Sequence, residues 1–371
     1  MDARQLVPAR SILEAAVAAR AFPGAVLAVG YNGETSVVPT GYLTYEDGSA
    51  PVRPNTIYDL ASLTKVVATT TATMILHERG ALSLDRPVAL YLPDFLEPYD
   101  TAADPLWAAR GEITVRHLLA HASGLPPYER FFLRAREKSH VLAEALALPL
   151  AATPGKKTAY SDVGFILLGA IIEQVSMQGL DAFCETEIFS PLGMIDTRFN
   201  PPEALWDRIA PTESDTEFRK RLIRGEVHDE NAWVMSGVAG HAGLFGTAAD
   251  LARFCSMMLT GGMLAGGKAG ERRILKPETI LEFTRPWPAS DGPARGLGWD
   301  KPSEPSSCGR YFSASSYGHL GFTGTSIWSD PEKNLFVVLL TNRVHPSRTN
   351  EAIRQVRPAV HDAVAWGLHL V

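Results

Sequence analysis

The spacing of hydrophobic residues predicts strands at both ends of the chain and helices between them. Near the start, an apolar run over 24–30 and a β-prone run over 35–43 flank Asn32-Gly33, a sequence typical of a tight hairpin turn. Near the end, the β-prone segment 317–329 and the continuous apolar run 335–340 predict further strands. We therefore expect one antiparallel sheet of about five strands, built from both ends of the chain.

Apolar residues at helical spacing predict several helices around and between these strands. A stretch without Gly or Pro predicts a helix over 59–79, with Asp59 as its N-cap and Gly80 directly after its last turn. The run 66–71 is rich in β-branched residues, which disfavour a helix, so burial has to stabilise this part. Further helices are predicted over 8–20, 115–122, 141–148, 163–175, 248–259 and 350–370.

These elements predict an α+β fold with two parts. Residues 1–80 and 291–371 would form the sheet domain, flanked by terminal helices, and residues 81–290 would form an inserted, mainly helical domain. The length of 371 residues suits two domains. The active cleft would lie between them.

Composition excludes several classes of protein. The chain carries 35 Lys+Arg against 41 Asp+Glu, a net charge of -6, so it lacks the positive excess of a nucleic-acid binder. Hydrophobic residues make up 46% of the chain, which suffices for a large core. Three widely spaced cysteines fit neither a disulfide framework nor a zinc site.

The sequence also bears on location. Charged residues interrupt the first 20 positions, so no secretory signal is recognised, and no apolar run approaches the ~18 residues of a membrane span. We expect a cytoplasmic protein, or a periplasmic or secreted one if a leader has been removed.

A candidate nucleophile lies in the segment 62–65, Ser-Leu-Thr-Lys. Residues three apart share a face of a helix, so the Ser62 hydroxyl and the Lys65 amine can meet. In the first turn, Ser62 would also feel the positive end of the helix dipole. A serine beside a neutral amine is an activated nucleophile, but a Ser-x-x-Lys string arises readily by chance.

Two further strings follow in order. Tyr160-Ser161-Asp162 opens the helix predicted over 163–175, and His319-Leu320-Gly321 precedes the last β-prone segment. Together the three strings resemble the three motifs of the serine β-lactamase and penicillin-binding-protein superfamily, with His for Lys in the third as in its class C-type branch. The strings at 113–125, 191–194 and 243–254 are similar to this superfamily as well, so the resemblance covers most of the chain.

The resemblance implies a role for each matching residue. Ser62 would attack a carbonyl and form an acyl-enzyme that water hydrolyses, while Lys65 and Tyr160 share the proton transfers. The backbone N–H groups of Ser62 and Phe322 would form the oxyanion hole. The residues expected to bind substrate are Asp162, His319, Gly321, Thr323, His228 and His241. His319 would offer a hydrogen-bond donor or a conditional positive charge to a substrate carboxylate.

Asp162 departs from the superfamily pattern, in which Asn usually ends the second motif. A carboxylate only accepts hydrogen bonds, and it stabilises a protonated lysine. An ionised Asp162 would therefore shift proton abstraction from Lys65 toward Tyr160, and it would repel a substrate carboxylate. We accordingly expect cleavage of related amides or esters in preference to β-lactams.

The segment 225–243 carries His228 and His241 together with three acidic residues. It resembles the subgroup of cell-wall-recycling amidases and low-activity carboxypeptidases, which points to muropeptide-like substrates. A polar cleft lining, a solvated loop and a metal site are all open, but the spacing fits no zinc signature. His117 and His121 have the spacing of a zinc-protease helix, yet Leu118 stands where its catalytic Glu belongs. We expect no metal and no other cofactor.

The sequence thus predicts a serine hydrolase that cleaves an amide or ester bond through an acyl-enzyme on Ser62, in a peptidoglycan-derived peptide or a β-lactam-like molecule. Two alternatives stay open. One is a promiscuous carboxylesterase, and the other is a non-catalytic penicillin-binding or sensor protein. The expected partner is a small molecule or a peptide, not a nucleic acid, and the oligomeric state is left open.

Overall fold

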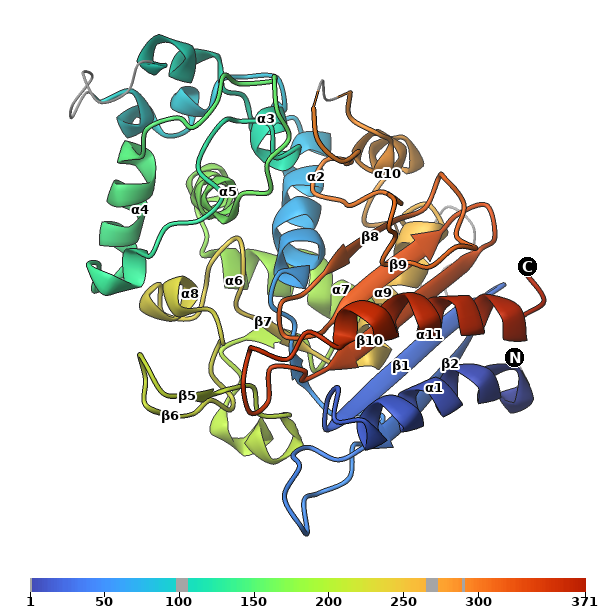
Figure 1. Ribbon diagram of the computed structural model, residues 1–371. Coiled ribbons are helices and arrows are strands. Elements are labelled where there is room, and N and C mark those ends of the chain that lie inside the picture. Colours follow the sequence, from blue (N-terminus) through green and yellow to red (C-terminus); the bar gives the residue numbers. More distant parts are fainter. Residues whose placement is uncertain (1, 98–105, 265–272, 289–290) are drawn as a thin grey trace.

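A five-stranded antiparallel sheet lies at the centre of the structure, a computed structural model that describes residues 2–97, 106–264, 273–288 and 291–371. The strand order is β2-β1-β10-β9-β8 (Figure 1). The strands are β1 (Gly24–Tyr31), β2 (Glu34–Gly41), β8 (Tyr317–Leu320), β9 (Ser326–Asp330) and β10 (Leu335–Thr341). The predicted α+β fold, with its sheet built from both ends of the chain, is confirmed.

The hairpin between β1 and β2 turns at Asn32 and Gly33. Both residues have positive φ angles, 50° and 84°, as a two-residue type I′ turn requires. On its other side, β1 pairs with β10 from Ala25 opposite Thr341 to Tyr31 opposite Leu335. The adjacent strands β1 and β10 therefore come from opposite ends of the chain.

The two faces of the sheet are covered by different helices. Helices α1 (Val7–Ala18) and α11 (Ile353–Gly367) cover one face (Figure 1), where Leu27 of β1 is buried. Val26 points to the opposite face, against which α9 (Ala248–Leu259) packs. Helix α9 belongs to the segment predicted as the inserted domain, and the domain boundaries themselves stay a prediction.

The rest of the chain forms helices and short strands beside the sheet. Helix α5 (Asp162–Ser176) runs through the centre of this part and is almost wholly buried. The other helices are α2 (Thr71–Glu78), α3 (Val115–Leu119), α4 (Lys138–Ala147), α6 (Leu180–Cys184), α7 (Ser190–Leu192), α8 (Glu230–Val234) and α10 (Pro277–Thr284). Short 3-10 and π-helical turns are η1 (Ala3–Leu6), η2 (Lys65–Thr70), η3 (Val88–Leu90), η4 (Pro93–Leu96), η5 (Trp107–Glu112), η6 (Phe131–Leu133), η7 (Glu185–Phe189) and η8 (Glu203–Arg208).

Two small sheets complete the fold. Strands β3 (Tyr58–Asp59), β7 (Leu244–Gly246) and β4 (Arg198–Phe199) form one, and β5 (Ser214–Asp215) and β6 (Arg221–Leu222) form the other. Within the described ranges, no single helix is long and apolar enough to cross a membrane. One pair, 162–176 with 180–192, passes that test together but is bent by 74°.

The segment predicted as one helix over 59–79 has a different start. Asp59 belongs to β3, and its carboxylate accepts the N–H groups of Ala61 at 2.8 Å and of His228 at 2.6 Å. The N-cap prediction for Asp59 is therefore wrong, because the loop after β3 uses this side chain. The π-helical turn η2 contains the β-branched run and is buried throughout, as expected. Gly80, with φ +70°, does follow the helix.

Leu27→Ala should destabilise the fold, because Leu27 is fully buried between the sheet and the terminal helices. We expect the free energy of unfolding to fall by about 2–5 kcal/mol, through lost contacts and a residual cavity. Leu281→Ala is the matched control: Leu281 is 67% exposed on α10, and its loss should change stability by less than about 0.5 kcal/mol. Urea denaturation followed by circular dichroism measures both, and equal losses would contradict this placement of Leu27.

Candidate active site

Ser62 lies between β3 and η2, at the point where the helix begins. Its Oγ accepts hydrogen bonds from Lys65 Nζ at 2.9 Å and from the Tyr160 hydroxyl at 2.9 Å. Tyr160 directly precedes α5, whose N-cap Ser161 accepts the N–H of Gly164 at 3.1 Å. A capped helix start therefore holds the phenol in place. The structure brings together the three polar groups that the sequence singles out.

Lys65 is fully buried, and its ammonium group has three partners. Besides Ser62, these are the Asp162 carboxylate at 2.7 Å and the backbone carbonyl of His241 at 2.9 Å. Burial alone would lower the pKa of Lys65, but the charge of Asp162 and the hydrogen bonds of Asp162 and Tyr160 outweigh it and raise the pKa above its usual 10.5. Lys65 is therefore a charged ammonium at neutral pH.

The Tyr160 phenol is neutral in the resting site. Burial raises its pKa to about 12, and although Lys65 acts to lower it, the charge of Asp162 raises it further. The Lys65 ammonium lies 4.9 Å from the centre of the Tyr160 ring and the Arg295 guanidinium lies 5.3 Å from it. These two cations would stabilise a phenolate that forms during proton transfer.

The turn 321–325 between β8 and β9 lies against the loop that carries Ser62. The hydroxyls of Thr323 and Thr325 donate to the carbonyls of Asp59 at 2.8 Å and Leu60 at 3.0 Å. A Cβ on Gly321 would lie only 1.9 Å from Thr325 Oγ1, so no larger residue fits there. This close fit places the nucleophile loop beside the edge of the main sheet.

The backbone N–H groups of Ser62 and Phe322 are free to bind a ligand. Neither N–H has an acceptor within the described ranges, and both residues line the cleft. Two unpaired N–H groups beside a nucleophile are what a carbonyl oxygen needs as it becomes negative. The predicted oxyanion hole is therefore geometrically available, and its function stays a prediction.

The cleft has two adjoining lobes that meet at Ser62, Tyr160, Phe322 and Arg348. The smaller lobe, about 310 Å³, is also lined by Tyr128, Asp162, His228 and His241. The larger lobe, about 540 Å³, is lined by His319, Gly321 and a group of arginines. Of the residues expected to bind substrate, only Thr323 lines neither lobe, because its hydroxyl is buried against Asp59.

His319 is uncharged at neutral pH. Burial lowers its pKa to about 4, with Lys65 and Arg295 contributing in the same direction. Its Nδ1 lies 2.9 Å from the carbonyl of Leu320, an acceptor, so Nδ1 carries the proton and Nε2 is left as an acceptor. His319 thus offers a substrate neither the conditional positive charge nor, through Nε2, the donor that the sequence analysis expects.

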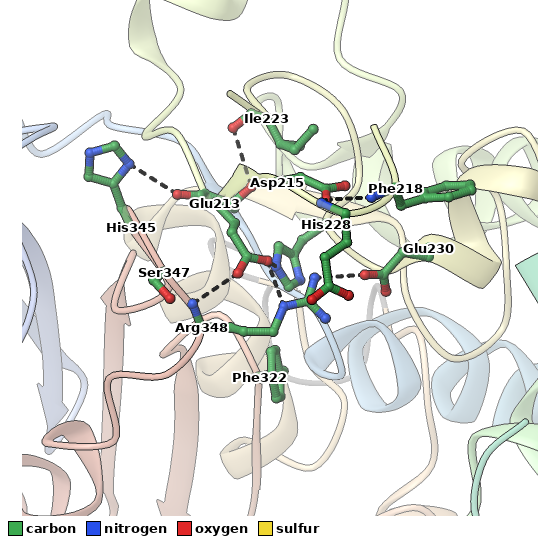
Figure 2. A network of polar contacts seen from close by, with 12 residues as sticks. Glu213, Asp215, Phe218, Ile223, His228, Glu230, Phe322, His345, Ser347 and Arg348 are labelled. Atoms are coloured by element: carbon green, nitrogen blue, oxygen red, sulfur yellow. Dashed lines mark hydrogen bonds and ion pairs between the residues drawn. The ribbon is translucent and has the colours of Figure 1, made fainter. Parts of the chain in front are cut away.

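A network of charged side chains borders the smaller lobe (Figure 2). Glu213 Oε2 lies 2.9 Å from His228 Nε2 and accepts from Arg348 Nε at 2.6 Å. Glu230 accepts from Arg348 Nη2 at 2.6 Å, and the His228 ring stacks on Phe322 with 5.6 Å between ring centres. Sequence analysis missed Glu213 and Arg348, since a contact across 135 residues leaves no local pattern.

The histidine pairs do not form a metal site in the described part of the chain. There, no group of three or more His, Cys, Asp or Glu side chains could hold an ion. His121 accepts the N–H of Ser161 at 3.0 Å, and its ring packs at a tilt against that of Tyr160 with 4.7 Å between ring centres. His241 lies 2.9 Å from the carboxylate of Asp229. Both histidines support neighbouring residues of the site.

A serine hydroxyl between an amine and a phenol, beside two free N–H groups, is the site of a serine acyl-transfer enzyme. Comparison with known proteins defines the family. Residues 9–361 match the family model described as Beta-lactamase, so the chain belongs to the Beta-lactamase family and is a serine hydrolase. A Salmonella typhimurium protein named "Putative D-alanyl-D-alanine carboxypeptidase" is 34% identical over 342 residues, 84% of this chain and 77% of that protein.

Solved structures agree with this assignment. The structure of "EstCE1, a hydrolase with promiscuous acyltransferase activity" has a TM-score of 0.76 at 24% identity, covering 96% of this chain and 98% of that one. The octameric penicillin-binding protein homologue from Pyrococcus abyssi has a TM-score of 0.73 at 25% identity, covering 97% of this chain and 77% of that one. The recognised family and fold are thereby confirmed.

Asp162→Asn should move the pH dependence of catalysis to lower pH. The Asp162 charge raises the pKa of both Lys65 and Tyr160, so its removal lowers both and leaves more of the base deprotonated at pH 7. We expect kcat/KM for a chromogenic short-chain ester at pH 7 to rise about tenfold for each unit by which the pKa falls. The exposed Asp181→Asn on α6 is the control. A profile identical to that of the parent protein would contradict this role for Asp162.

Proposed function

We propose that Ser62 is the nucleophile of an acyl-enzyme hydrolase with a D-alanyl-peptide carboxypeptidase or amidase activity on peptidoglycan-derived peptides. The observation that carries the proposal is the position of Ser62 Oγ, 2.9 Å from both Lys65 Nζ and the Tyr160 hydroxyl. Ser62 also lies where the two lobes of the cleft meet, so a substrate bond there would have room on both sides.

In the acylation step, Ser62 Oγ attacks the carbonyl carbon of the substrate. Lys65 is already charged and cannot accept the proton, so acylation proceeds from molecules in which Tyr160 has lost its own proton and is a phenolate stabilised by Lys65 and Arg295. This phenolate takes the Ser62 proton as Oγ attacks and becomes a neutral phenol. Tyr160 then gives a proton to the leaving amine or alcohol. The N–H groups of Ser62 and Phe322 bind the carbonyl oxygen as it becomes negative.

In the deacylation step, water attacks the acyl group on Ser62. Tyr160 is a phenolate once it has protonated the leaving group, so it accepts the water proton and then gives it to Ser62 Oγ as the acid product leaves. The Asp162 carboxylate acts indirectly, because it keeps Lys65 charged at 2.7 Å. That charge lowers the energy of the phenolate in both steps.

Two observations support this substrate class: the names of similar proteins and the positive charge of the larger lobe. Relatives 34% identical to the chain carry the name D-alanyl-D-alanine carboxypeptidase. The larger lobe is lined by Arg343 and Arg357, which make no ion pair with a carboxylate in the described ranges, so the lobe has excess positive charge. A peptide that ends in a free carboxylate suits this lobe better than a neutral one.

A carboxylesterase is the second candidate. The smaller lobe includes the half-exposed Phe322 and Tyr128, which would accept a short apolar acyl chain. The structurally similar EstCE1 is a hydrolase with acyltransferase activity. A non-catalytic sensor is less well supported, because the three groups needed for turnover are all in contact.

The compartment and the assembly also belong to this proposal. Cys184, Cys255 and Cys308 are buried free thiols, which suits the reducing cytoplasm. A substrate in that compartment would be a peptide released from the cell wall and taken up. The relative from Pyrococcus abyssi is octameric, whereas the oligomeric state of this chain stays open.

Ser62→Ala should abolish turnover of D-alanyl-D-alanine peptides, short-chain esters and cephalosporins alike, by at least about 1,000-fold in kcat. An alkyl phosphonate should label the parent protein once, at Ser62, in a peptide identified by mass spectrometry. Ser139→Ala, at an exposed position of α4, is the matched control and should keep full activity.

The relative values of kcat/KM rank the proposed activities. The carboxypeptidase proposal requires the peptide to exceed the ester, and the reverse order supports the esterase. A Ser62 adduct that never clears, with no turnover of any substrate, supports the sensor. Full activity in Ser62→Ala would rule out the nucleophile itself.

A further inference from the structure

Two arginines lie behind the turn that carries Phe322. Arg357 of α11 donates from Nη2 to the carbonyls of Gly321 at 3.1 Å and Thr325 at 3.0 Å, at the two ends of the turn. Arg343 follows β10 and donates from Nε to the carbonyl of Phe322 at 2.8 Å. Both side chains belong to residues that are less than a tenth exposed. Three carbonyls of one turn are thus bound by buried guanidinium groups.

The bond to Gly321 fixes a direction as well as a position. The peptide unit that joins Gly321 and Phe322 is planar and trans, so its C=O and its N–H point in opposite directions. Arg357 and the N–H of Gly324, at 3.1 Å, both bind this C=O, so the N–H of Phe322 points away from the Arg357 guanidinium. Phe322 also lines the smaller lobe together with Ser62. A rotation of this one peptide would turn the N–H out of the site.

The hydrogen bond from Arg357 to the Gly321 carbonyl also makes the Phe322 N–H a stronger donor. A hydrogen bond from a charged group to a peptide carbonyl polarises that peptide and makes its N–H a better donor. Arg357 forms no ion pair with a carboxylate in the described parts of the chain, so its charge is not neutralised by a direct partner. Burial lowers the pKa of Arg357 to about 10, which still leaves it charged at neutral pH.

We propose that Arg357 is a positioning residue of the oxyanion hole, acting through the Gly321–Phe322 peptide to aim and polarise the Phe322 N–H. The proposal rests on the acyl-enzyme function proposed for Ser62. A buried cation paired only with neutral carbonyls is a poor way to stabilise a fold, since desolvation of the charge opposes it. A role in stabilising the negative oxygen of the transition state would explain why the Arg357 guanidinium lies behind the Gly321–Phe322 peptide.

The direct test is Arg357→Met, which keeps much of the apolar stem and removes the guanidinium. Removal of an oxyanion-hole donor lowers kcat by about 100- to 1,000-fold in serine proteases. For a neutral short-chain ester, which has no carboxylate for the larger lobe to attract, a misdirected donor should lower kcat by about 10- to 100-fold, with KM changed by less than about threefold. The rate of phosphonate labelling should fall by the same factor as kcat, because the phosphonate forms a tetrahedral adduct with a charged oxygen.

Arg10→Met is the matched control. Arg10 is exposed on α1, lines neither lobe of the cleft, and lies 3.6 Å from the side chain of Glu14. The control removes the same charge from a helix on the same face of the sheet without touching the turn or the cleft, so kcat should stay within about twofold of the parent. Arg357→Lys keeps a charge and one donor nitrogen and should recover part of the lost kcat.

Active-site titration separates positioning from misfolding. A purely structural loss would reduce the fraction of chains that a phosphonate labels, whereas kcat for each labelled site would be unchanged. The proposal predicts the opposite pattern. A kcat per site equal to that of the parent, or a loss no greater than in Arg10→Met, would overturn it. If Arg357→Met does not fold, the same comparison is made with Arg357→Lys. An active Ser62→Ala would instead overturn the underlying function.

Discussion

The ion pair between Lys65 and Asp162 is the interaction on which the rest of the site depends. A buried ammonium is unfavourable by several kcal/mol unless it is paired and hydrogen-bonded. Lys65 meets this condition only where three segments converge: Asp162 from α5, the His241 carbonyl from the segment before β7, and Ser62 from its own helix. Because the Lys65 ammonium needs these partners, α5 and the segment before β7 both pack against the loop that carries Ser62. In the proposed mechanism the ion pair also decides the chemistry, because a charged Lys65 leaves Tyr160 as the group that accepts the Ser62 proton.

A second constraint holds the nucleophile against the sheet. The turn 321–325 is bonded on one side to the carbonyls of Asp59 and Leu60 and on the other to Arg357. The predicted oxyanion hole therefore lies between β3 and the edge strand β8, where side chains of the turn and of α11 bind backbone carbonyls. If the proposal for Arg357 holds, the last helix of the chain supports catalysis as well as covering the sheet.

Local patterns in the sequence predicted much of this structure. The Asn32-Gly33 turn and the apolar runs in β1 and β10 determine the sheet, because hairpin geometry and burial act over a few residues. Three short motifs indicated Ser62, Lys65 and Tyr160. The predictions failed where a long-range contact redirects a local preference. Asp59 looks like a helix cap but bonds to Ala61 and His228, and the hydroxyl of Thr323 is taken by Asp59. Arg343, Arg348 and Arg357 were missed because their partners are carbonyls or acids that no spacing reveals.

The central claim is that Asp162 keeps Lys65 charged, so that the resting site relies on Tyr160 as its base. The most direct measurement is an NMR titration of the Lys65 Nζ resonance in protein labelled with ¹⁵N-lysine, assigned by comparison with Lys65→Arg. The account predicts that Lys65 stays protonated up to and beyond pH 10.5, the ordinary pKa of a lysine. A Lys65 that loses its proton near neutral pH would contradict the account, because a free amine would then stand beside Ser62 and could itself accept the proton.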